Sequence, residues 1–180
     1  MSDDNDERRR FTEYFAARQA SLRRTAYLLC GDWHWADDLT QTAFVRLAAA
    51  WQRVRDPGAV DAFVRTCLVR VYLAESRRAW RRRENTVAEP PERAGRDDDA
   101  ETVTRQMVFA RALAQLPPRQ RATLVCRFYQ ELDVAATATA LGCSEGTVKS
   151  QTARGLAALR AALTGSGYDL TPLGVVLEKD

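Results

Sequence analysis

Apolar residues recur every three or four positions along most of the chain, and this spacing predicts amphipathic α-helices rather than strands. In the N-terminal part we expect three helices: one over about residues 11–29, one that ends near residue 54, and one over about residues 59–83. A glycine follows the first helix, Asp32 or Asp37 can cap the second, and a DPG turn precedes the third. The residues expected to face the core are Phe15, Leu22, Ala26, Leu29, Leu39, Ala43, Leu47, Trp51, Phe63, Cys67, Leu68, Val71 and Tyr72.

A second run of helical periodicity begins near residue 102. Its first helix should end at the pair Pro117–Pro118, because Pro118 suits the first turn of a new helix. The apolar residues expected in this second core are Val103, Met107, Ala110, Leu113, Leu124, Val125 and Phe128. Between the two runs, residues 84–101 have no periodicity and contain two adjacent prolines, so they are predicted to be a linker.

The stretch LGCSEGTVKSQTARGLAAL, at residues 141–159, has the features of a helix-turn-helix. A short helix over about residues 133–141 is followed by Gly142, which can adopt a positive φ, and by Ser144, whose hydroxyl can cap the next helix. The next helix would turn Val148 and Leu156 to the core and expose Thr147, Lys149, Ser150, Gln151 and Arg154. This face, rich in hydrogen-bond donors, is either solvated or lies in the major groove of DNA, and the spacing alone leaves both interpretations open.

The expected fold class is therefore all-α, with two small helical domains at residues 11–84 and 102–163. The first is a three- to four-helix bundle and the second contains the helix-turn-helix. A flexible acidic linker, residues 85–101, joins them. Residues 1–10 are predicted to be a disordered start, and residues 164–180 a tail that is either disordered or folded back on a domain or regulator.

The net charge of +3 is small, but the charged residues are unevenly distributed along the chain. Residues 65–83 hold seven arginines against one glutamate, whereas residues 84–101 hold seven acidic residues against two arginines. Opposite blocks that lie side by side indicate two surfaces with different partners, or one surface and one tail.

Candidate chemistry of other kinds is sparse. The four cysteines, Cys30, Cys67, Cys126 and Cys143, form no CxxC pair and are expected to be buried reduced thiols, with a redox or metal role as the alternative. We expect no enzyme activity, no metal and no cofactor, because the sequence has no glycine-rich phosphate loop and no Ser/His/Asp set. The charged first ten residues and the lack of a long apolar run predict a cytoplasmic protein that is not inserted in a membrane.

Three stretches also resemble the extracytoplasmic-function (ECF) group of bacterial sigma-70-type factors. ADDLTQTAFVRLAAAW, at 36–51, is similar to region 2.2 of that family, and FVRTCLVRVYLAESRRAWRRRE, at 63–84, to regions 2.3 and 2.4. The stretch from ALAQLPPRQR to GLAALR, at 112–160, is similar to region 4. The pattern is most similar to the actinobacterial SigE-like subgroup. The resemblance implies a dissociable subunit of RNA polymerase that recognises promoters and helps to open them.

The resemblance also implies roles for particular residues. The surface that docks on the clamp helices of the polymerase β′ subunit would consist of Asp37, Asp38, Leu39, Gln41, Thr42 and Phe44. The −10 element would be bound and opened by Arg70, Tyr72, Arg77, Arg78, Trp80, Arg81, Arg82 and Arg83, although Tyr72 and Trp80 could equally belong to the core. The −35 element would be read by Lys149, Ser150 and Arg154, with backbone contacts from Thr147 and Gln151. The acidic linker would lie in the RNA exit path of the polymerase.

The implied partners are promoter DNA, the core polymerase through its β′ clamp helices and β flap, and an anti-sigma protein. The chain departs from the family pattern at Arg70–Val71, where many relatives have asparagine, at Gln151, where arginine is common, and in YQELDVAAT at 129–137. These departures bear on which promoter is recognised. A stand-alone helix-turn-helix regulator, which would need neither the basic helix nor a polymerase docking surface, is the alternative.

Overall fold

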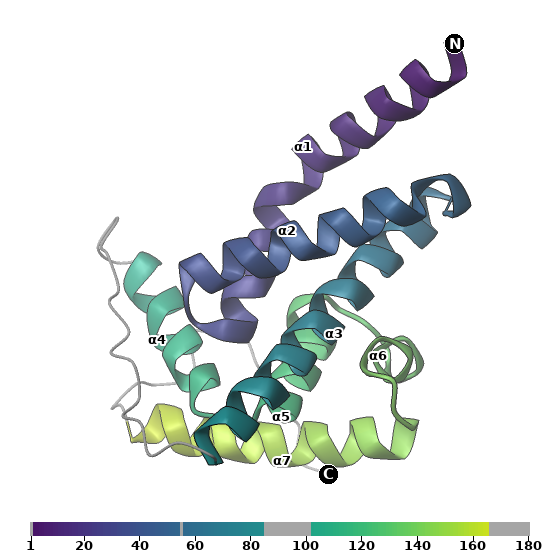
Figure 1. Ribbon diagram of the computed structural model, residues 1–180. Coiled ribbons are helices and arrows are strands. Elements are labelled where there is room, and N and C mark those ends of the chain that lie inside the picture. The colour runs from purple at the N-terminus through teal and green to yellow at the C-terminus, as the bar shows by residue number, and fades with distance from the viewer. Residues whose placement is uncertain (1, 55, 85–101, 166–180) are drawn as a thin grey trace.

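A computed structural model of the chain describes residues 2–54, 56–84 and 102–165. These residues form helices joined by short turns, with no strand among them, as the all-α prediction required (Figure 1). The elements are α1 (Ser2–Cys30), α2 (Trp33–Ala50), the 3₁₀ turn η1 (Trp51–Arg53), α3 (Pro57–Glu84), α4 (Thr102–Ala114), α5 (Pro118–Leu124), the π-helical turn η2 (Val125–Tyr129), α6 (Val134–Leu141) and α7 (Glu145–Thr164). The predictions for the linker and for the tail beyond residue 165 lie outside the described residues.

The start of α1 differs from the prediction. The helix begins at Ser2, so residues 2–10, which were expected to be disordered, are helical, and Figure 1 shows this end projecting beyond the bundle. Arg9 lies 3.1 Å from Asp6 and 3.9 Å from Glu13, one turn away on either side. Such pairs contribute a few tenths of a kcal/mol each to a helix. The hydrophobic pattern missed this segment because a charged helix end has no apolar stripe.

The first bundle consists of α1, α2 and α3. Gly31 ends α1 with a φ of +73°, and Asp32 caps α2 by accepting a hydrogen bond from the Trp35 N–H at 2.7 Å. The other cap considered, Asp37, lies inside α2. Tyr14 donates a hydrogen bond to Asp61 at 2.7 Å and thereby ties α1 to α3. The buried side chains of this bundle include Leu22, Ala26, Leu29, Leu39, Ala43, Leu47, Leu68, Val71 and Tyr72, which confirms those core predictions.

In the second unit, α4, α5, α6 and α7 enclose Ala110, Leu113, Leu124, Val125 and Val148. One core prediction here is wrong: the Phe128 side chain is 50% exposed. It lies in η2, where the chain adopts π-helical geometry, and this turn shifts the positions that follow Cys126 relative to the α-helical stripe. The neighbouring Tyr129 is exposed as well.

The two helical units also pack against each other, which the sequence did not predict. A single cluster of buried apolar residues extends from Leu22 in α1 to Leu141 in α6. Arg121 of α5 is only 5% exposed, and its guanidinium donates hydrogen bonds to the carbonyl oxygens of Leu29 at 2.7 Å, Leu116 at 3.2 Å and Ala114. The described helices therefore form one body in which α5 is joined to the end of α1.

All four cysteines are free thiols. Cys30 and Cys126 are buried, and removal from water raises the pKa of each to about 12. Cys67 and Cys143 are half-buried, and burial also raises the pKa of Cys67. The expectation of reduced thiols in apolar surroundings is thus met for Cys30 and Cys126.

We predict that Cys30 and Cys126 resist alkylation in the folded protein. A thiol with a pKa near 12 has very little thiolate at pH 8, and the thiolate is the reactive form. Mass spectrometry after iodoacetamide treatment should find Cys143 modified well before either buried cysteine, and all four modified in denaturant. Equal rates at the four positions in the folded protein would contradict the burial described above.

Candidate nucleic-acid interface

The helix-turn-helix forms as the sequence predicted. Asp133 caps α6 by accepting the Ala136 N–H at 2.7 Å, and Gly142 closes that helix with a φ of +64°. Ser144 then caps α7 by accepting the Thr147 N–H at 3.1 Å. Only glycine adopts this φ without strain, and the Ser144 oxygen satisfies an amide that the start of α7 leaves unpaired. These local signals fix the angle between α6 and α7.

The inner side of α7 packs closely on α5. Val148 is completely buried. At Gly155, a Cβ atom would lie 3.1 Å from Cγ of Leu124, which is tighter than ordinary side-chain contact. The absence of a side chain at Gly155 therefore allows α7 to approach α5 more closely than any other residue would. Leu156, the second predicted anchor, is half-buried and packs against the same core.

The outer side of α7 carries the predicted hydrogen-bond donors. Lys149, Ser150 and Arg154 are exposed, whereas Thr147 and Gln151 are half-buried. The Thr147 hydroxyl lies 2.9 Å from the Ser144 hydroxyl, and Ser150 donates to the Thr147 carbonyl at 3.0 Å. Lys149 and Arg154 are therefore the two charged groups of this set on the exposed face, while Thr147 also serves the start of the helix.

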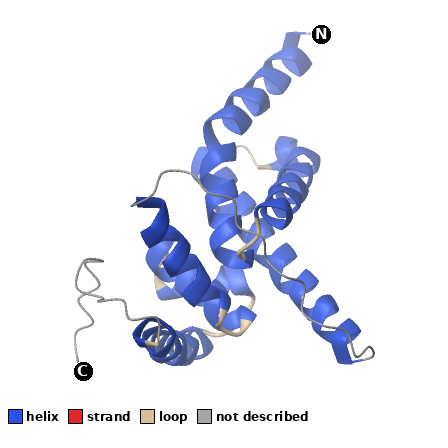
Figure 2. Ribbon diagram, turned by 90° about the vertical axis from the view of Figure 1, so that its left-hand side faces the viewer, coloured by secondary structure: helices blue, strands red, loops and turns tan. Residues whose placement is uncertain are grey.

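The second half of α3 is a basic surface. Its exposed side chains are Arg77, Arg78, Arg81 and Arg82. Trp80 lies among them with 62% of its side chain exposed, so the core alternative for this residue is excluded. Figure 2 shows this end of α3 projecting away from α7. The side chain of Arg83 lies outside the described residues.

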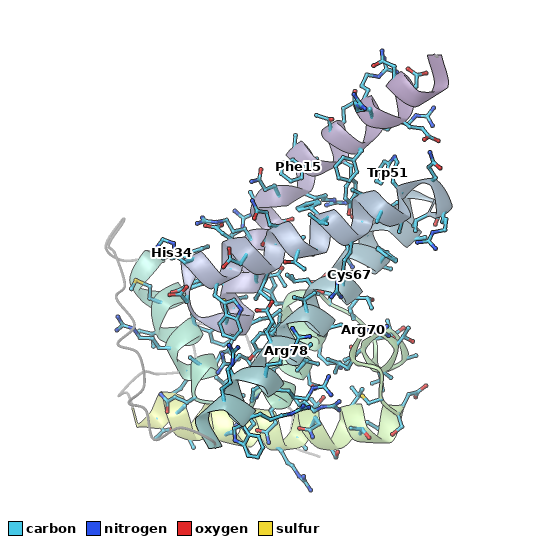
Figure 3. The ribbon with its side chains drawn as sticks, viewed as in Figure 1. Phe15, His34, Trp51, Cys67, Arg70 and Arg78 are labelled. Carbon is cyan, nitrogen blue, oxygen red and sulfur yellow. The ribbon has the colours of Figure 1, made fainter. Side chains whose placement is uncertain are left out.

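The structure corrects one member of the predicted −10 set, Tyr72, and shows a second, Arg70, in contact with the other helical unit. Tyr72 is 1% exposed and packs against the Trp35 ring with centroids 5.8 Å apart, so it belongs to the core and has no free face for a base. Arg70 is turned toward the second unit, where its guanidinium donates to the carbonyl oxygens of Thr139 at 2.9 Å and Ala140 at 3.2 Å (Figure 3).

On α2, the predicted docking set divides by helical periodicity. Asp37, Asp38 and Gln41 are exposed and Thr42 is half-buried, with its hydroxyl bonded to the Asp38 carbonyl at 2.9 Å. Leu39 and Phe44 are buried in the bundle. Those two predictions are therefore corrected: both side chains stabilise α2 from within and present no surface to a partner.

Sequence reasoning missed a stack of side chains beside this α2 face. The Trp33 ring stacks on Tyr27 with centroids 4.0 Å apart, and the Arg23 guanidinium lies 4.4 Å from the Trp33 centroid. Arg23 also forms a bidentate ion pair with Asp37, and this hydrogen bonding holds the pKa of Asp37 below its ordinary value. The aromatic residues were visible in the sequence, but their pairing with a residue of α1 was not.

Other chemistry is not evident in the described part of the chain. No group of three or more His, Cys, Asp and Glu side chains there is arranged to hold a metal ion. Among the helices whose positions are known, none has both the length and the apolar character needed to cross a membrane.

Comparison with known proteins agrees with this arrangement. Residues 14–82 match the family described as Sigma-70 region 2, and residues 106–159 match Sigma-70, region 4. The chain is 36% identical to the RNA polymerase sigma-E factor of Streptomyces avermitilis, covering 91% of this chain and 90% of that protein. It is 32% identical to the ECF RNA polymerase sigma factor SigM of Mycobacterium tuberculosis, covering 85% and 76%. The chain therefore belongs to the sigma-70 family, within its ECF group.

A solved structure shows the same fold. The sigma factor RpoE of Bartonella quintana, crystallised in complex with the anti-sigma factor NepR, has a TM-score of 0.72 and 21% sequence identity to this chain. The similarity covers 86% of this chain and 96% of that one. At this level of identity the comparison concerns the arrangement of helices.

Two glycines in the helix-turn-helix provide a matched test of its geometry. Gly142→Ala should destabilise the protein by about 1–2 kcal/mol, because a Cβ there has open space but the residue must keep a positive φ. Gly146→Ala should be neutral or stabilise by up to about 1 kcal/mol, because its Cβ would meet only the Ser144 hydroxyl, at an ordinary 3.8 Å. Urea denaturation followed by circular dichroism measures the free energy of unfolding of both variants. Similar changes in the two variants would contradict the prediction that the positive φ at position 142 makes alanine costly there.

Proposed function

We propose that this chain is a promoter-recognition subunit of bacterial RNA polymerase that reads the −35 element with α7 and binds and opens the −10 element with the basic end of α3. The observation that carries the proposal is the presence, on one chain, of two separate exposed surfaces rich in hydrogen-bond donors, the outer side of α7 and the basic end of α3. A cytoplasmic location follows from these partners.

The −35 assignment rests on the outer side of α7. In helix-turn-helix proteins the N-terminal part of the second helix enters the major groove, where lysine and arginine bind guanine edges or phosphates. Lys149 lies in the second turn of α7 and Arg154 a turn and a half further along, and both are exposed. Ser150 is a further candidate for base contact. Thr147 and Gln151, which are half-buried, suit contacts to the phosphate backbone near the helix start.

The −10 assignment rests on the second half of α3. Four exposed arginines within two turns of helix neutralise phosphates, and each such contact adds to the salt dependence of binding. Trp80 offers an exposed ring on which an unpaired base could stack, an interaction of about 1–3 kcal/mol. Strand opening requires phosphate neutralisation and base stacking on the same surface. Tyr72 has no part in this proposal, because its ring is enclosed by α2.

The polymerase assignment rests on the exposed face of α2, with Asp38 and Gln41 at its centre and the Arg23–Asp37 pair beside them. Figure 1 shows α7 along the lower edge of the molecule and α2 above it, with α3 and α5 between them, so a partner on α2 leaves α7 open to DNA. We propose the β′ clamp helices as the partner of this face and the β flap as a partner of the second unit. An anti-sigma protein would compete for the same surfaces. A stand-alone regulator is not favoured, because it would leave the α2 face and the basic end of α3 without a role.

The test of the function is run-off transcription with purified core RNA polymerase on a library of genomic upstream fragments. We expect transcripts that depend on this protein and that share a pair of short sequence motifs. Tight binding of duplex DNA by the protein alone, with no transcripts, would contradict the proposal and favour a stand-alone regulator.

The double variant Lys149→Ala, Arg154→Ala should weaken binding to the upstream motif by at least roughly tenfold, since good contacts to bases contribute about 1–3 kcal/mol each. It should also reduce the slope of log K against log salt by about 2 if both residues contact phosphates. Fluorescence anisotropy with a labelled duplex measures both quantities. Arg160→Ala, at the other end of α7, is the matched control. An equal loss of affinity in this control would show that removing any positive charge from α7 weakens DNA binding. It would contradict specific contacts by Lys149 and Arg154.

The variant Asp38→Arg should lower the affinity for core polymerase by roughly tenfold or more. A tenfold loss corresponds to about 1.4 kcal/mol of binding free energy. Asp38→Asn should give a smaller loss, because it removes the charge without reversing it. Biolayer interferometry with immobilised core polymerase makes the comparison. Unchanged affinity in both variants would show that the docking face lies elsewhere.

A further inference from the structure

The basic part of α3 contains one acidic residue, Glu75, among the seven arginines of residues 65–83. Glu75 lies three positions before Arg78, one of the four exposed arginines at the basic end of the helix. Side chains at this spacing are neighbours on a helix surface, and a carboxylate and a guanidinium placed there attract each other. An ion pair between Glu75 and Arg78 would neutralise one of the charges that the basic end offers to DNA.

In the structure the carboxylate is bound elsewhere. The indole N–H of Trp35, in the first turn of α2, donates a hydrogen bond to Oε2 of Glu75 at 2.6 Å. Both side chains are half-buried, whereas Arg78 is exposed. The ion pairs found among the described residues include neither Glu75 nor Arg78. The carboxylate is therefore held against α2, and the Arg78 guanidinium faces solvent.

The indole that holds Glu75 is itself fixed at two points. The backbone N–H of Trp35 donates to the cap residue Asp32 at 2.7 Å, and its ring packs against Tyr72, which is 1% exposed, with centroids 5.8 Å apart. A donor that is already ordered loses little conformational entropy when it forms a hydrogen bond. A half-buried hydrogen bond to a carboxylate is also stronger than an ion pair between exposed side chains. Glu75 is therefore more stable on Trp35 than on Arg78.

We propose that Trp35 is a positioning residue for the basic end of α3: it holds Glu75 against α2 and thereby leaves Arg78 available to a DNA phosphate. The inference rests on the proposed function. Trp35 acts through Glu75 and makes no contact with DNA in this arrangement. A residue of α2 thus determines how many positive charges α3 presents.

Binding of single-stranded DNA to the full-length protein tests this role. The probe is a fluorescein-labelled strand of mixed sequence and about 20 nucleotides, long enough to cover one binding site. Trp35→Phe keeps an aromatic ring against Tyr72 but removes the N–H donor. In fluorescence anisotropy this variant should bind about three- to fivefold more weakly at about 0.1 M salt, and its slope of log K against log salt should fall by up to about 0.7, the value for one phosphate contact.

A second substitution separates positioning from packing. The double variant Trp35→Phe, Glu75→Gln should recover the affinity and the salt slope of the wild type, because a neutral amide cannot neutralise Arg78. A loss caused only by poorer packing around residue 35 would not recover. Trp51→Phe is the matched control, since it makes the same change where the ring packs against Phe11 and Tyr14, and it should match the wild type.

Two results would overturn the inference: unchanged binding in Trp35→Phe, or a loss that Glu75→Gln does not restore. Failure of the proposed function has a different signature. In that case Arg78→Ala would bind the strand with the same affinity and the same salt slope as the wild type, and the inference would fall with it.

Nuclear magnetic resonance tests the hydrogen bond without DNA. In a proton–nitrogen correlation spectrum the Trp35 indole signal is identified by its loss in Trp35→Phe. It should move upfield in Glu75→Gln, because a hydrogen bond to a neutral amide is weaker than one to a carboxylate. The indole signals of the other three of the four tryptophans should stay in place. An unchanged Trp35 signal would show that its indole does not bind the carboxylate and would overturn the inference.

Discussion

The structure depends on one buried guanidinium. Arg121 brings together three segments that end in unpaired carbonyl groups: the last turn of α1, the last turn of α4 and the turn that leads into α5. A buried cation is costly unless such acceptors surround it, and the acceptors in turn require a donor once water is excluded. The two terminal nitrogens of the guanidinium donate to these three carbonyl oxygens, which offsets part of the cost of burying the charge. This mutual requirement fixes the second unit on the first and determines which surfaces of both remain exposed.

The exposed surfaces follow from where the apolar stripes end. In α3 the buried positions stop after Leu73, and the helix continues as a rigid basic rod beyond the core. In α7 the inner side is held by Val148 and Gly155, so the donors on the other side face outward. The helices that enclose the core thus also present the charged groups proposed to bind DNA. No loop among the described residues contributes to either proposed surface.

The sequence predicted the features that local chemistry decides. Asp32, Gly142 and Ser144 each act on amides or dihedral angles within a few residues, and all three took the predicted roles. The resemblance to sigma factors was confirmed. It assigned whole stretches of sequence to partners, whereas helical periodicity places some residues of each stretch in the core and others on the surface. Leu39, Phe44 and Tyr72 are the predicted contact residues that lie in the core. Contacts such as that of Arg70 with α6 could not be predicted, because backbone carbonyls have no sequence signature.

The glycine at position 155 gives the molecule a further property. It touches no surface proposed to bind DNA, yet it sets how deeply α7 sits on its support, since Leu124 occupies the space that any side chain would need. The contact between Gly155 and Leu124 therefore sets the distance between α7 and α5. Selection acting on the pair Gly155 and Leu124 could change the position of the outer side of α7, which is proposed to bind DNA, while every residue on that side stays the same.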